Sequence, residues 1–160
     1  MPKQEKGIPA MRVMDVPEFQ DATDLAAVNE GLTVRDAAAL MTGRNIGAVI
    51  VLRDGRMSGI FTERDLMTKV AAHGLDCAST LVRDVMTRDV VTVSPDVELN
   101  TCLRTMTEGG FRHLPVVDPE GEPMGMVSQR DFVALTFGQA LRRMRGTARQ
   151  GLRNLLKGGG

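Results

Sequence analysis

The sequence has few of the side chains from which metal sites and disulfide frameworks are built. Its 160 residues include two cysteines and two histidines. Cys77 and Cys102 are not in a Cys-x-x-Cys arrangement, and two histidines are too few for a histidine-rich metal site. The sequence therefore predicts reduced thiols, with neither a structural disulfide nor a metal site.

Long apolar runs are also absent. No window of about 18 apolar residues occurs, which argues against a membrane-spanning helix. The first ten residues, MPKQEKGIPA, lack the apolar core of a signal peptide. We therefore expect a chain without a membrane span that is located in the cytoplasm.

The chain as a whole carries no excess charge, since 20 basic residues balance 20 acidic ones. Six of the basic residues follow Asp131, the last acidic residue, so the first 131 residues hold 14 basic and 20 acidic side chains. An acidic body is a poor surface for a phosphate backbone, so nucleic acid is not expected as a partner. Residues 141–160 are predicted to form a basic amphipathic tail, which packs on its own dimer or contacts an acidic partner or an anionic membrane surface.

Motifs of common enzyme classes are missing as well. The sequence has no P-loop, no nucleophile elbow and no cluster of metal-ligating side chains. His113 could serve as a general acid or base, but no partnered nucleophile accompanies it. It is better explained as a strand-edge histidine close to anions. The sequence therefore predicts no catalytic residue and a protein that is not an enzyme.

The most informative feature present is an octet written twice. Residues 59–66 read GIFTERDL and residues 125–132 read GMVSQRDF. At the same offset of 66 the turn DGR meets EGE, and at an offset of 65 the upstream segments 24–29 and 33–41 meet 89–94 and 98–106. Order and spacing are both kept, which predicts two copies of one small structural unit.

Each copy has the pattern of a βαββα unit, and the fold class is therefore predicted to be α+β. Short strands at 25–28 and 90–93 end in the helix-start residues Asn29 and Ser94. The helices that follow have apolar residues at i, i+3, i+4 and i+7 and end at Gly43 and at Gly109-Gly110. The apolar positions are Val34, Ala37, Ala38 and Met41 in the first copy and Leu99, Cys102, Leu103 and Met106 in the second. Two such units would pack by a pseudo-two-fold axis, because one alone cannot cover both faces of its sheet.

The octet lies where a strand meets a second helix. Thr62 and Ser128 are placed as N-caps, and Asp65 and Asp131 three residues later complete a capping box. The alternative is a ligand site, since a helix N-terminus attracts anions and a carboxylate accepts hydrogen bonds from a vicinal diol such as ribose. The arginine that precedes each aspartate is repeated too, although a cap does not require it.

These octets, together with RHLPVVD (112–118), DVMT (84–87) and VVTVSPD (90–96), resemble the CBS (cystathionine β-synthase) domain in a tandem pair. The resemblance covers about residues 11–140. It divides the chain into a flexible N-terminus (1–10), a first repeat (11–74), a second repeat (75–140) and the tail (141–160).

CBS pairs are regulatory modules, and the resemblance implies an adenosine-containing ligand in each of two clefts between the repeats. Each cleft would combine one octet with backbone and cations of the other repeat. The first cleft would use Thr62, Asp65, the backbone of Val91 and Thr92, and Arg112, His113 and Arg130. The second would use Ser128, Asp131, the backbone of Ala26 and Ala27, the Ile46-Gly47 strand edge and Arg64.

On this assignment the first cleft holds up to three cationic groups and the second holds one. We therefore expect the first cleft to bind nucleotide more tightly and to favour di- and triphosphates. No cofactor is expected beyond the nucleotide, although Mg²⁺ could accompany ATP.

The implied function is that of an adenine-nucleotide sensor that modulates a partner protein whose identity the sequence does not give. The alternative is a purely structural dimerisation module with vestigial clefts. In both cases we expect a homodimer, with the helices after the octets in contact through Leu66, Val70, Phe132 and Leu135.

Overall fold

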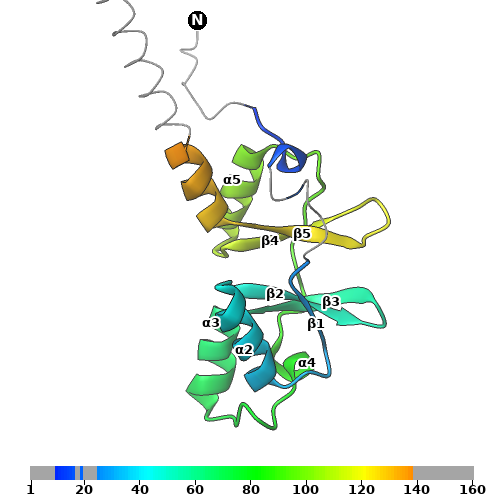
Figure 1. Cartoon of the computed structure of the whole chain (residues 1–160), viewed down its shortest axis with the longest axis vertical. Coiled ribbons are helices and arrows are strands. Elements are labelled where there is room, and N and C mark those ends of the chain that lie inside the picture. The colour runs from blue at the N-terminus through cyan, green and yellow to red at the C-terminus, as the bar shows by residue number, and fades with distance from the viewer. Residues whose placement is uncertain (1–9, 17–18, 20–24, 139–160) are drawn as a thin grey trace, which may run out of the picture.

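The computed structural model describes residues 10–16, 19 and 25–138 and shows two halves that meet at their sheets (Figure 1). The expected tail and residues 1–9 lie outside the described residues. The first half contains β1 (Ala27–Asn29), α2 (Val34–Arg44), β2 (Ala48–Arg53), β3 (Arg56–Thr62) and α3 (Glu63–Asp65), which continues as the π-helical η2 (Leu66–Val70) and the 3-10 turn η3 (Ala71–His73). The second half contains α5 (Leu99–Gly109), β4 (His113–Val117), β5 (Pro123–Ser128) and helical residues 129–138. The short element η1 (Val13–Asp15) precedes the first half in sequence, and α4 (Val82–Val85) precedes the second.

The two sheets share one pairing pattern. In the first half β1 runs parallel to β2, with Val28 opposite Val51, and β2 is antiparallel to β3. In the second half β4 is antiparallel to β5, and Val93 forms a single parallel bridge to Val116. The α+β class and the repeated unit are therefore confirmed.

The strand expected at 90–93 is wrong, because only Val93 joins the sheet. Val91 is 46% exposed, and Pro95 has no N–H group with which to extend the ladder. The carbonyl of Pro95 instead accepts from the N–H of Met14 (3.0 Å), a residue from the start of the chain.

The expected helix starts are also wrong, although the helices exist. The N-caps are Thr33, whose hydroxyl accepts from the N–H of Asp36, and Glu98, which makes no side-chain cap. Asn29 instead ends β1 and accepts from the N–H of Gly31 (2.9 Å). The first helix runs past Gly43 to a left-handed Asn45, whereas the second ends at Gly109-Gly110 as predicted.

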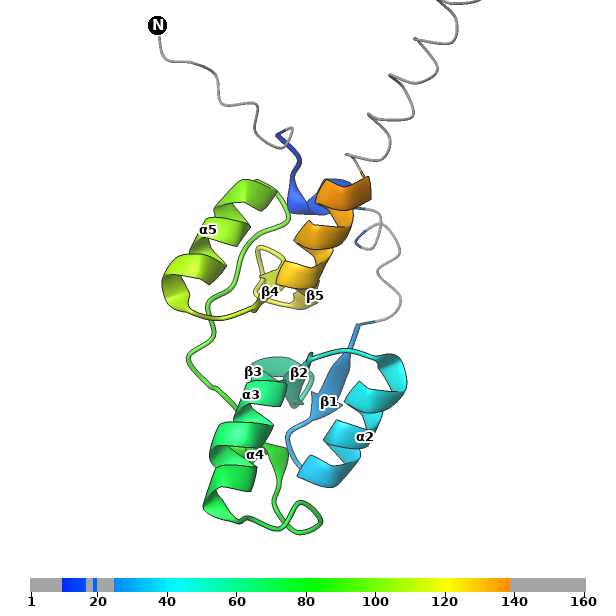
Figure 2. The same ribbon diagram turned by 90° about the vertical axis from the view of Figure 1, so that its left-hand side faces the viewer.

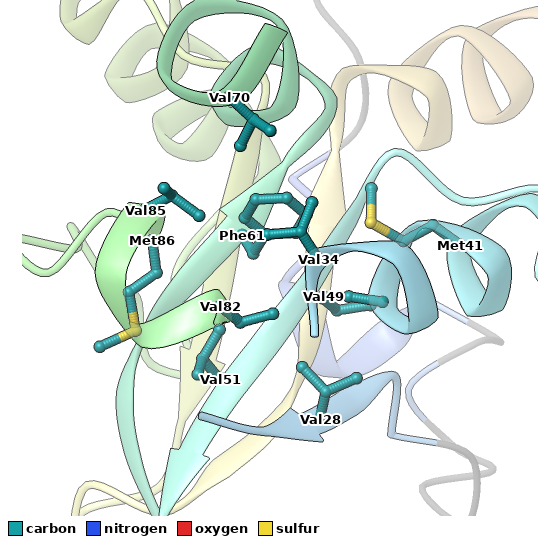
Figure 3. Packing of buried hydrophobic residues seen from close by; sticks show 11 residues of the cluster. Val28, Val34, Met41, Val49, Val51, Phe61, Val70, Val82, Val85 and Met86 are labelled. Carbon is teal, nitrogen blue, oxygen red and sulfur yellow. The ribbon is translucent and has the colours of Figure 1, made fainter. Parts of the chain in front are cut away.

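Each half has its own apolar core. The periodic positions of both helices face these cores, since Val34, Ala37 and Met41, and likewise Leu99, Cys102 and Met106, are buried. Figure 3 shows the first core, in which Phe61 of β3 lies among side chains of α2, β2 and α4. Burial raises the pKa of the Cys102 thiol, which favours an unreactive neutral side chain.

The cores exchange chain segments. Val13 and Val16, from the start of the first repeat, pack into the core of the second half, and Val13 N–H donates to the carbonyl of Val97 (2.9 Å). Val82 and Val85, from the start of the second repeat, pack into the core of the first half. Each entry segment therefore packs in the half that is formed by the other repeat. A division of the chain by packing thus differs from the sequence-based division between residues 74 and 75.

Four helical segments lie on one side of the molecule, namely α2, the α3–η3 run, α5 and residues 129–138 (Figure 2). The dimer contact expected from the sequence is wrong for Val70 and Phe132, because both side chains are buried in the cores of the same chain. Leu66 and Leu135 are partly buried against those cores.

Gly59 allows the closest approach of backbone between β3 and the segment after α4. A Cβ at this position would lie 2.6 Å from the carbonyl oxygen of Thr87, and the neighbouring Ile60 exchanges two hydrogen bonds with Thr87 (2.9 and 2.8 Å). We expect Gly59→Ala to lower the free energy of unfolding by about 1–3 kcal/mol in urea titrations, because a backbone oxygen cannot move aside cheaply. Gly43→Ala is the control: nothing lies within 4 Å and the helix should gain up to about 1 kcal/mol. Equal effects of the two substitutions would contradict this account.

Candidate functional site

Two cavities lie at the junction of the halves, and both include Gly47, Arg112 and His113 in their walls. The smaller has a volume of about 170 Å³. The larger has a volume of about 1000 Å³. Only the larger is within the range of about 300–1,000 Å³ that is typical of small-molecule sites.

The smaller cavity corresponds to the first predicted cleft. The structure brings together Thr62, Asp65, Val91, Arg112 and His113. Thr92 is not in its wall. Arg64 lines this cavity in place of the expected Arg130.

The larger cavity corresponds to the second predicted cleft. Its wall includes Ser128, Asp131, Ala26, Ile46 and Gly47. Ala27 is instead paired with Ile50 inside the sheet. Arg130 lines this cavity in place of the expected Arg64.

The predicted exchange of arginines between the clefts is therefore wrong. Arg64 and Arg130 each line the cavity of their own octet, since each lies in the same helical turn as the N-cap. Because Arg112 lines both cavities, each is bounded by two arginines. The charge asymmetry that ranked the first cleft above the second does not exist in the structure.

Both octets form complete capping boxes. In the first, Asp65 Oδ2 accepts from the N–H (2.9 Å) and hydroxyl (3.0 Å) of Thr62, whose Oγ1 accepts in turn from the N–H of Asp65 (3.2 Å). In the second, Asp131 Oδ2 accepts from the N–H (2.7 Å) and hydroxyl (3.0 Å) of Ser128. One carboxylate oxygen of each octet is thus committed to the cap.

The helix N-termini are less available to anions than the sequence suggests. The N–H of Glu63 donates to the carbonyl of Gly47 (3.0 Å), and the N–H of Gln129 donates to the carbonyl of Arg112 (3.0 Å). The aspartate N–H of each octet is taken by the cap hydroxyl. Two of the three first-turn N–H groups of each helix are therefore already bonded within the protein.

The two carboxylates differ at their second oxygen. Asp65 Oδ1 accepts from Thr87 Oγ1 (2.9 Å) and forms an ion pair with Lys69 Nζ (2.9 Å), and the residue is 5% exposed. Within the described part of the chain, Asp131 Oδ1 has no hydrogen-bond partner and the residue is half-buried. The second octet therefore presents a free acceptor and the first does not.

The repeated arginines join the halves. Arg64 Nη1 donates to the carbonyl of Gly110 (2.6 Å), and Arg130 Nη1 donates to the carbonyl of Asn45 (3.1 Å). Asn45 and Gly110 are the C-caps of α2 and α5, so each cation meets the negative end of a helix in the other repeat. The two contacts are equivalent in the two repeats. They explain why the octet contains an arginine in both copies although the helix cap does not need it.

His113 lies between the cavities. Burial and the neighbouring Arg112 guanidinium lower the pKa of its imidazole, against the opposing effects of Glu63 and Asp131. The ring is therefore neutral at pH 7 and offers one donor and one acceptor. A Cβ on Gly47 would meet the Glu63 carboxylate first and would lie 3.3 Å from His113 Nε2, so the glycine leaves room for both side chains.

Sequence reasoning missed Lys69 and Thr87. Lys69 follows Asp65 by four residues in a helix, a spacing at which opposite charges pair, so this contact was accessible from the sequence. Thr87 reaches Asp65 from the exchanged segment, and no local pattern indicates that contact.

Two general features of the described residues bear on the type of site. No group of three or more histidine, cysteine, aspartate or glutamate side chains is arranged to hold a metal ion among them. None of the helices that the structure describes combines the length and the apolar character needed to cross a membrane.

Comparison with known proteins identifies both repeats. The CBS domain model matches residues 16–72 and again residues 82–138. A mitochondrial CBS domain-containing protein of Arabidopsis thaliana, CBSX3, is 39% identical over 106 residues, which is 63% of this chain and 51% of that protein. The chain thus spans about half the length of this relative. A cytoplasmic location stays a prediction, since this relative is mitochondrial.

Solved structures give the same result. A CBS-domain protein from Burkholderia ambifaria superimposes with a TM-score of 0.69 at 34% identity, covering 76% of this chain and 87% of that one. The CBS domain pair of MJ0100, solved in complex with 5′-methylthioadenosine and S-adenosyl-L-methionine, shares the fold with a TM-score of 0.71 at 23% identity, covering 82% and 99% of the two chains.

The arginine contacts between the repeats can be tested by truncation. We expect Arg64→Ala and Arg130→Ala each to lower the free energy of unfolding by about 0.5–1.5 kcal/mol, the usual contribution of one hydrogen bond. Arg104→Ala, on the exposed side of α5 and without a partner among the described residues, should change it by less than about 0.5 kcal/mol. Chemical denaturation of the three variants gives the comparison, and an equal cost at Arg104 would rule out the proposed role.

Proposed function

Because the chain belongs to the CBS domain family, with two CBS domains in tandem, we propose that it is a regulatory protein that binds an adenosine-containing ligand between its repeats. We place the ligand in the larger cavity. The observation that carries this choice is Asp131, whose Oδ1 has no partner among the described residues and which lines a cavity large enough for a nucleoside.

A nucleoside would use three features of this cavity. Asp131 Oδ1 can accept hydrogen bonds from the two ribose hydroxyls, while Oδ2 stays in the cap. Arg112 and Arg130 can pair with phosphate oxygens, which guanidinium groups do with good geometry. An apolar wall can take the adenine ring; it includes Ala38, Met41, Ile46, Ile50 and Met126.

The ligand class also has support from the fold. The MJ0100 pair has the same fold and is solved with two adenosyl ligands. The sequence-based expectation was an adenosine-containing ligand, and the two arginines in the wall of the larger cavity favour a phosphorylated one.

We infer no chemistry at this site. The hydroxyls of Thr62 and Ser128 donate to Asp65 and Asp131 within capping boxes, where the carboxylates also accept from backbone N–H groups, so both pairs are used to cap helices. The output of such a module would be a change of contact with a regulated partner. The competing proposal, a structural module with vestigial clefts, gains support from the same complete caps, and ligand binding decides between the two.

We propose that a second copy covers the helical side of the molecule. Large apolar side chains remain exposed there: Met67 on η2 is 62% exposed, and Val133 and Phe137 in the last described helix are 66% and 68% exposed. Residues 133 and 137 share one face of their helix. Exposed apolar side chains on one side of a protein are typical of a protein–protein contact.

Light scattering tests the dimer. The parent should have about twice the mass of one 17.3 kDa chain at micromolar concentration, and Met67→Glu/Phe137→Glu should be monomeric, because buried charges oppose the contact. Leu75→Glu, at another exposed apolar position, should stay dimeric. A monomeric parent would refute the proposal.

Calorimetry with adenosine, AMP and ATP tests the ligand proposal. Removal of a hydrogen-bonded partner costs about 1–3 kcal/mol, so Arg112→Ala should weaken ATP binding by roughly 5- to 150-fold. Adenosine binding should change less than threefold, because it has no phosphate. Asp84→Ala, at an exposed position on α4, should leave all three affinities unchanged. If the parent binds none of the three, nor S-adenosylmethionine or NADH in a thermal-shift screen, the structural alternative replaces the sensor.

A further inference from the structure

We propose that Lys69 withholds the Asp65 carboxylate from nucleosides, so that each chain holds one nucleoside, in the cavity of Ser128 and Asp131. This inference rests on the proposed function. It adds that the tandem repeat provides one ligand site instead of two, and that the contact of Lys69 with Asp65 distinguishes the octet without a ligand from the octet with one.

The Lys69 ammonium group is fully engaged. Its Nζ lies 2.9 Å from Asp65 Oδ1, 3.1 Å from Thr87 Oγ1 and 3.3 Å from the carbonyl oxygen of Met86. An ammonium group has three donors, and three acceptors surround this one. Although the side chain is 41% exposed, these contacts hold its charged end in one place.

The carboxylate of Asp65 is saturated as a result. Oδ2 accepts from the N–H and hydroxyl of Thr62, and Oδ1 accepts from Thr87 and pairs with Lys69. A carboxylate has about four lone-pair sites, so no acceptor remains for a ribose diol. A nucleoside would have to displace Lys69 from a carboxylate whose side chain is 7% exposed, and would leave that ammonium group without its counter-charge.

The second repeat lacks this contact. At the octet offset of 66, Lys69 corresponds to Leu135, which packs against the second core and has no charge to offer. Asp131 Oδ1 therefore stays free among the described residues. The difference of lysine and leucine at this position, together with the Thr87 hydroxyl that donates to Asp65 Oδ1, distinguishes the occupied carboxylate from the open one.

The cavity volumes agree with this assignment. The occupied carboxylate borders a space of about 170 Å³. The open one borders a space of about 1000 Å³. Arg112 lines both and forms no ion pair within the described chain, so it is available to a ligand in the larger cavity.

Calorimetry with AMP provides the test, read as stoichiometry and affinity per chain. The parent should bind one AMP per chain, and Asp131→Ala should weaken that binding at least tenfold. Leu135→Lys should also weaken it at least tenfold, because it places an ammonium group within reach of Asp131, whereas the control Leu135→Met should bind within threefold of the parent. Lys69→Leu, which copies the second repeat, should allow a second AMP to bind, more weakly than the first because Thr87 still donates to Asp65 Oδ1.

The outcomes separate this inference from the proposed function. Two AMP molecules per parent chain, or binding that survives Asp131→Ala, would overturn the role of Lys69 and leave the sensor function in place. A parent that binds no adenine ligand would overturn both. If Lys69→Leu does not fold by circular dichroism, Leu135→Lys decides the matter, and AMP binding unchanged in that variant would refute the inference.

Discussion

Each half of this molecule depends on a segment that precedes the other half in sequence. Val82 and Val85 fill the core of the first repeat, and Val13 and Val16 fill the core of the second. A unit of this size buries too little apolar surface to be stable alone. The exchange therefore supplies missing core and also fixes the two sheets relative to each other, and the cavities exist because that geometry is fixed.

The exchanged segment also determines the state of the first octet. Thr87 directly follows the buried Met86 and donates to Asp65, while Lys69 bonds to both residues of that segment. The carboxylate thus ties the helix after the octet to the chain that enters the second repeat. In the first repeat, Asp65, the carboxylate that the CBS resemblance would assign to ribose, joins two segments of the chain through Lys69 and Thr87.

Much of the fold could be predicted because its determinants are local. The offset of 66 between the octets located Thr62 and Ser128, and the caps there need only residues three apart. The helical periodicity likewise identified the buried faces of α2 and α5. The strand at 90–93 failed because the position of Pro95 beside Met14 is a tertiary fact that no window of sequence contains.

The site was harder to predict, because its contacts connect residues that are distant in sequence. Arg64 was expected to approach a ligand across the axis, yet it bonds to Gly110 and lines the cavity of its own octet. The predicted difference in positive charge between the two clefts is therefore not found, because each cavity is lined by two arginines. What separates the clefts is instead the set of neighbours of each carboxylate: Lys69 lies at a helical spacing that the sequence shows, whereas Thr87 comes from a distant segment that no local pattern indicates.

Duplication allows the two copies to use one motif differently. In a single unit the carboxylate must either be satisfied within the protein or be left open for a ligand, because an unpaired buried acceptor lowers stability. With two copies, Asp65 is satisfied by Lys69 and Thr87 and contributes to the junction of the repeats. Asp131, which is half-buried, can then keep one oxygen free of protein partners among the described residues. A carboxylate oxygen without a protein partner beside a large cavity is available to a ligand, while the fully bonded carboxylate of the first octet helps to hold the two repeats together.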